Sequence, residues 1–171
     1  MSGTVDYGSI TDEVNDGVYS TGDIPSRTDR VFRDIRLCFE SRLSGLSTDF
    51  SNIIYENTQF DLSTLDKDED GVSWIRGTLL PAETVSAAIG TSGSDLHSGL
   101  FRIDYFNEVG VGGYEVDMDI IANAFVKGDT LIAGTTEVRI KNVSLGVGRR
   151  DGAFFARNID IEYFAYTAAR T

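Results

Sequence analysis

Residues 100–125, LFRIDYFNEVGVGGYEVDMDIIANAF, constrain the fold more than any other part of this chain. Phe101, Ile103 and Tyr105 alternate with charged residues, and a period of two puts their side chains on one face of a strand. Three glycines within 110–113 predict a tight turn. Apolar residues then recur at helical spacing: Tyr114, Met118, Ile121 and Phe125. The stretch therefore predicts a strand, a glycine turn and an amphipathic helix.

The rest of the chain adds a helix and further strands. Apolar residues at helical spacing predict a helix from about residue 28 to Gly45, and a short strand is expected near 53–55. A strand over 72–80 should stop at Pro81, which lacks a ladder donor, and the small polar residues 82–98 favour a long loop. Glycines at 146–152 separate two late strands, at 137–141 and 155–166. This order predicts the α+β class, with an antiparallel or mixed sheet and two main helices packed on one face.

The N-terminal segment differs from the remainder in composition. Residues 1–26 contain five acids, no Lys or Arg, and few large apolar side chains. We expect residues 1–26 to be an acidic, flexible arm and 27–171 to be a single domain, since 171 residues suit one core.

The formal charge of −12 argues against tight DNA binding, which relies on Lys and Arg at the phosphates. Two explanations remain open: an acidic surface that keeps the protein soluble, or a lumen wall that repels DNA. No apolar run approaches the roughly 20 residues that span a bilayer. The single cysteine, Cys38, is expected to be a packed thiol in a protein made in a reducing cytoplasm.

One motif resembles a metal site. Residues 66–71, DKDEDG, match the first six positions of an EF-hand loop, which makes Asp66, Asp68 and Asp70 the metal candidates. Gly77 stands where the bidentate acid of position 12 belongs, and a strand follows instead of a helix. A solvated acidic turn is the alternative, and it is the one we favour.

No constellation for catalysis or cofactor binding is present. His97 is the only histidine, and a Ser–His pair adjacent in sequence rarely has triad geometry. The turn at 110–113 mimics a dinucleotide fingerprint, but Glu115 replaces its third glycine and would repel phosphate. We therefore predict no catalytic residue, no cofactor and no enzymatic activity.

Several side chains are candidates for contacts between subunits. Arginines at every third position form a stripe on the first helix, a tryptophan sits in a strand, and two arginines make a basic spot at a turn. The interface candidates are Arg30, Arg33, Arg36, Trp74, His97, Arg149 and Arg150. For each group a plainer role is open: solvated ion pairs for the stripe, core packing for the tryptophan, and solvation for the turn.

The chain resembles the tail terminator proteins of long-tailed bacteriophages. The resemblance lies in DRVFRDIRLCFESRL, IIYENTQF, VSWIRGTLLPAE, SGLFRIDYFNEVGVGGYEVDMDIIANAF and ARNIDIEYFAY, which together span roughly residues 28 to 166. Residues 1–26 fall outside it.

The resemblance implies a structural virion protein of the tail and neck, assembled in the host cytoplasm. Such proteins form a ring, usually a hexamer, that caps the completed tail tube, ends its polymerisation and offers a surface to the head connector. The implied partners are other copies of the chain, the tail tube protein and the connector or stopper, with DNA passing through the lumen unbound. The alternatives are another neck ring, such as a stopper or adaptor, and a calcium-binding module.

Overall fold

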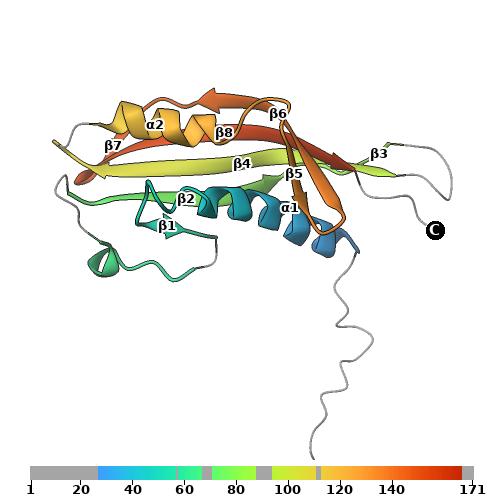
Figure 1. Ribbon diagram of the computed structural model, residues 1–171, viewed down its shortest axis with the longest axis horizontal. Helices are drawn as coiled ribbons and strands as arrows, with labels where there is room; N and C mark the ends of the chain where they lie inside the picture. Colours follow the sequence, from blue (N-terminus) through green and yellow to red (C-terminus); the bar gives the residue numbers. More distant parts are fainter. Residues whose placement is uncertain (1–26, 57, 67–70, 88–93, 111–112, 167–171) are drawn as a thin grey trace, which may run out of the picture.

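The computed structural model describes residues 27–56, 58–66, 71–87, 94–110 and 113–166. Within them, one sheet has the strand order β1-β2-β4-β8-β6-β5, with β3 paired to β4 and β7 paired to β8. The long strands β4 and β8 run side by side at its centre (Figure 1). The pair β1 and β2 is parallel and every other pair is antiparallel. The predicted α+β class with a mixed sheet is confirmed.

The described elements follow in this order: α1 (Arg27–Ser44), β1 (Ile53–Ile54), the 3₁₀ turn η1 (Leu62–Thr64), β2 (Ser73–Pro81), β3 (Val85–Ser86), β4 (Asp95–Glu108), α2 (Tyr114–Asn123), β5 (Thr130–Ala133), β6 (Thr136–Leu145), β7 (Arg149–Asp151) and β8 (Phe154–Tyr166).

The main hydrophobic core joins the helices to the sheet. Phe39 of α1 stacks on Phe101 of β4, with ring centroids 4.5 Å apart and planes 10° apart. Buried residues of α2, among them Met118 and Ile121, belong to the same cluster as buried residues of α1. The narrower expectation that both helices cover one face stays a prediction.

Close packing explains a glycine in the middle of β2. A Cβ atom on Gly77 would lie 2.6 Å from Cζ of Phe101 and 3.0 Å from Cδ2 of Leu43. Because real Cβ contacts are longer than this, Gly77 lets α1 and Phe101 approach the strand.

The strand–turn–helix unit over 100–125 is present as predicted. Gly113 precedes α2 with φ of 92°, a left-handed conformation that suits glycine. The buried Tyr105 of β4 then donates a 2.5 Å hydrogen bond to the Asp117 carboxylate of α2. The helix ends at Asn123, before the predicted stop at Gly128, whose φ of 92° belongs to a later turn.

The prediction of one continuous loop over 82–98 is wrong. Val85–Ser86 is a strand, and β4 begins at Asp95 rather than at 100. The backbone N–H groups of Ala82 and Ala87 donate to Ser98 and Ser94, which makes the two ends of this segment the arms of a hairpin. Small polar residues have low strand propensity, so the sequence pattern did not indicate a strand here. The first residues of β4 are nevertheless held in the sheet because they also pair with β8.

The C-terminal third contains two strands that the pattern did not predict. β5 pairs with the start of β6, and β7 lies within the stretch expected to be a turn. Both have four residues or fewer, too few for alternation to mark them. The proposed arm, residues 1–26, lies outside the described residues.

Candidate interaction surface

The sheet carries side chains on two faces, and only one of them contributes to the main core. Alternate residues of β2, β4 and β8 point to the other side, which we call the second face. Its apolar cluster consists of Val72, Trp74, Phe106 and Ala156, packed with Ile54, Leu65 and Phe154. No described residue of α1 or α2 belongs to that cluster. The second face is therefore the part of the sheet to inspect for partner binding.

Two cross-strand ion pairs occupy the middle of the second face. Arg102 of β4 and Asp160 of β8 are register partners, and the guanidinium donates hydrogen bonds of 2.7 and 2.9 Å to the carboxylate. These bonds lower the pKa of the Asp160 carboxyl from its ordinary value and raise that of Arg102. Arg76 approaches Asp104 at 3.3 Å in the neighbouring strand pair. The centre of the face is thus charged but paired.

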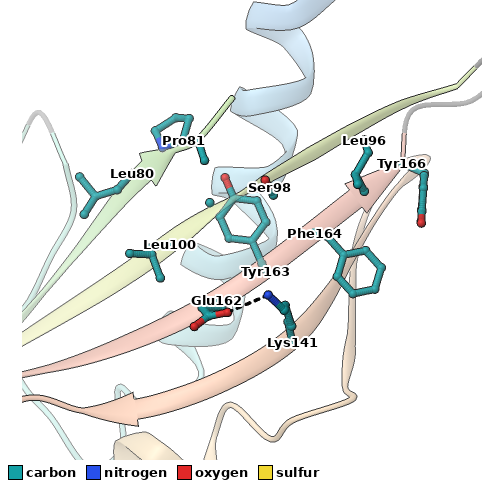
Figure 2. A pocket seen from close by; sticks show the side chains of 12 residues that line it. Leu80, Pro81, Leu96, Ser98, Leu100, Lys141, Glu162, Tyr163, Phe164 and Tyr166 are labelled. Atoms are coloured by element: carbon teal, nitrogen blue, oxygen red, sulfur yellow. Dashed lines mark ion pairs between the residues drawn. The ribbon is translucent and has the colours of Figure 1, made fainter. Parts of the chain in front are cut away.

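A large groove lies at one end of the second face (Figure 2). It has a volume of about 880 Å³, and the pair of Lys141 and Glu162, 3.2 Å apart, lies on its border. We call it the Tyr166 groove; its apolar lining includes Leu80, Pro81, Leu96, Leu100, Phe164 and Tyr166. Leu80 is 40% exposed and Tyr166 is 54% exposed, so apolar surface faces solvent here.

A smaller, aromatic groove of about 340 Å³ lies at the other end. Trp74 stacks on Phe106 with centroids 4.6 Å apart, and the ring of Phe154 meets it edge-on at the same distance. We call it the Trp74 groove; it is lined by Ile54, Phe60, Leu62, Trp74, Arg76, Phe106, Arg149, Asp151 and Phe154. Phe60 and Leu62 are 43% and 48% exposed.

The arginines of the stripe on α1 range from exposed to half-buried, and Nε of Arg36 is buried. Arg33 bonds Asp34 at 3.1 Å, and Arg36 approaches Glu40 at 3.7 Å, while Arg30 is exposed. Ion pairs within the helix are what the alternative to a subunit contact predicts for the stripe. Contact with a neighbouring subunit stays a prediction for this stripe.

The other predicted residues are divided between core and surface. Trp74 is 6% exposed, and His97 is 2% exposed, with its ring 5.5 Å from Phe32 and its Nδ1 3.1 Å from the Thr84 hydroxyl. Both therefore have packing roles within the chain, and their role as interface residues stays a prediction. Arg149 and Arg150 are exposed on β7, and Arg149 lines the Trp74 groove.

Apart from Trp74, sequence reasoning missed the apolar residues of the second face. Leu80, Leu100, Phe106 and Phe164 occupy positions that alternate with the core residues of their strands. Large apolar residues at the supposedly exposed positions of three strands were the available signal. Such residues indicate a sheet that has hydrophobic surface on both sides.

Of the three metal candidates, the structure describes only Asp66. Asp68 and Asp70 lie outside the described residues, and the backbone N–H of Asp66 donates to Oδ1 of Asn52 at 3.0 Å. In the part of the chain that the structure describes, no group of three His, Cys, Asp or Glu side chains could hold an ion. Nor is any helix there long and apolar enough to cross a membrane.

Comparison with known proteins first defines the class of fold. A solved structure with 21% sequence identity matches at a TM-score of 0.59, covering 77% of this chain and 92% of that one, and its name states no function. At this identity the likeness shows the fold alone, an α+β domain built on one mixed sheet. No curated protein matches the chain.

The family follows from a more specific match. A family model described as phage tail terminator protein matches residues 34–163, which is most of the chain and extends from within α1 to within β8. The chain belongs to the phage tail terminator family. Its class is accordingly that of structural proteins of phage tails.

Proposed function

We propose that copies of this chain form a ring that caps the completed phage tail tube and ends its polymerisation. The same ring provides the docking surface for the head connector. The family match over residues 34–163 carries this proposal, because termination is the role for which the family is described.

The surface of the chain suits such an assembly. A ring of identical subunits joined head to tail needs two different contact surfaces on each copy. The second face offers one, with apolar side chains exposed at both ends and paired charges between them. Paired charges in an interface fix the register and add less to affinity than the apolar anchors do.

The charge of the chain supports a passive lumen. With 27 acidic residues against 15 Lys and Arg, the protein repels phosphates on average, so DNA would pass through the ring without specific binding. The hexameric copy number expected from the resemblance is part of the proposal.

Tail length tests the proposal directly. Phage tails assembled without this protein should grow beyond their normal length and fail to join heads, as seen by electron microscopy. Adding back the purified protein should restore both. Tails of normal length that merely fail to join heads would favour the alternative, a stopper or adaptor ring elsewhere in the neck.

A further inference from the structure

The Trp74 groove combines features that select one kind of ligand. Its floor is aromatic, with Trp74 stacked on Phe106, and its rim carries the exposed apolar side chains Phe60 and Leu62. Arg76 lies with its guanidinium carbon 5.9 Å from the centroid of the Phe106 ring. Such a groove fits an extended peptide that has both apolar and acidic side chains.

Arg149 is one of the two cations that line the groove. Arg76 already approaches Asp104, whereas no carboxylate among the described residues lies within ion-pair distance of Arg149 or Arg150. Asp151 also lines the groove, so a basic peptide is not excluded by charge alone. Two cations of the lining, Arg76 and Arg149, against this one carboxylate nevertheless favour an acidic one.

The chain contains a segment of this chemistry. Residues 1–26 carry five acids and no basic side chain, and apolar residues are spaced between them. The acids are Asp6, Asp12, Glu13, Asp16 and Asp23, and the apolar side chains include Tyr7, Ile10, Val14, Tyr19 and Ile24. The other segments outside the described residues are short by comparison.

The attachment point of this segment leaves a groove on another copy within its reach. Residues 1–26 join α1 at Arg27, and Phe32, in the first turns of α1, borders the same small cavity as Pro81. Pro81 ends β2, whereas Trp74 lies near its start, so the helix begins at the opposite end of that strand from the Trp74 groove. An extended chain of 26 residues reaches at most about 85–95 Å, which is enough to extend across a neighbouring subunit.

We propose that residues 1–26 of one copy dock in the Trp74 groove of the next copy in the ring. Their acidic side chains pair with Arg149 and Arg76, and their apolar side chains pack on Phe60, Leu62 and Trp74. This inference rests on the proposed ring, because only an assembly brings a second copy to the groove.

Photo-crosslinking of the full chain tests the inference without assuming a register. The variant Phe60→p-benzoylphenylalanine places a reactive group on the rim of the groove, and Ile132→p-benzoylphenylalanine, at an exposed β5 residue, is the matched control. Each variant is prepared unlabelled and with ¹⁵N, mixed under dissociating conditions and reassembled. Irradiation and peptide mapping then show which segment, and which copy, was captured.

We expect crosslinks from position 60 to peptides within 1–26, joining labelled to unlabelled chains, and none of these from position 132. Arg149→Glu in the same background should lower the crosslink yield roughly fivefold, as expected for loss of about 1 kcal/mol. Lys127→Glu, a charge reversal at an exposed residue that is neither a groove residue nor an interface candidate, should leave it unchanged.

The outcomes separate this inference from the proposed function. Native mass spectrometry of the same samples shows whether rings form. Rings whose position 60 captures another segment, or captures 1–26 only within one chain, would overturn the inference and leave the ring intact. Monomers without crosslinks would overturn both.

Discussion

Arg102 on β4 and Asp160 on β8 face each other as register partners, joined by two hydrogen bonds across the centre of the sheet. The pair connects the two longest strands, and it lies on the second face, whose apolar cluster includes no described helix residue. Because its side chains are 39% and 23% exposed, water screens part of the attraction.

Asp160→Asn should therefore lower the free energy of unfolding modestly, by about 0.5–1 kcal/mol at neutral pH. The hydrogen bonds from Arg102 lower the pKa of the Asp160 carboxyl. The contribution of the ion pair to stability is therefore fully present above the ordinary pKa of 3.8, and it is lost as the pH falls through the lowered pKa. Urea unfolding at pH 7 and below pH 4 measures this. The difference between wild type and variant should shrink in acid; a difference independent of pH would contradict the assignment. Asp34→Asn, at an exposed pair on α1, is the control.

Gly77→Ala should destabilise the fold by about 1–3 kcal/mol, because the new methyl would overlap Phe101 and Leu43. Chemical denaturation gives the free energy of unfolding. Phe101→Leu in the same background removes the overlapping ring atom, so the double variant should lose less stability than the sum of the single changes. Additive losses would show that the strand accommodates the methyl group elsewhere.

Cys38 should react very slowly in the folded protein. It is 2% exposed, and burial raises the pKa of its thiol to about 11, so about one part in a thousand is thiolate at pH 8. A thiol reagent such as DTNB should modify it rapidly only after unfolding by guanidinium chloride. Fast modification of the native protein would mean that α1 opens readily.

Leu80→Glu should weaken assembly while leaving the fold intact, since Leu80 is 40% exposed and lines the Tyr166 groove. Leu37→Glu is a matched control, because Leu37 is 45% exposed on α1. Circular dichroism checks folding and sedimentation measures ring formation. Equal loss in both variants, or loss in neither, would argue against a role for the groove.

The sequence predicted the elements whose periodicity extends over several turns or residue pairs. The helix stripe around Phe39 and the alternation at Phe101, Ile103 and Tyr105 were sufficient, because the same residues form the core. The start of β4 near His97 and the short strand β7 were not predictable in this way. Both are held by pairing with β8, whose position is a property of the whole sheet.

The grooves were only partly predictable. Trp74 and Arg149 stood out as individual residues, but they are 75 positions apart and nothing in the sequence placed them in one cavity. Phe60 and Leu62 border the same cavity from a segment without regular periodicity. Tertiary structure alone brings these residues together.

Native mass spectrometry of the purified chain, alone and mixed with short tubes of its tail tube protein, tests the central claim most directly. The account predicts a closed ring with a single copy number, formed in solution or on tube ends, after which further tube protein no longer adds. A chain that stays monomeric with tube ends present, while the tubes continue to grow, would contradict it.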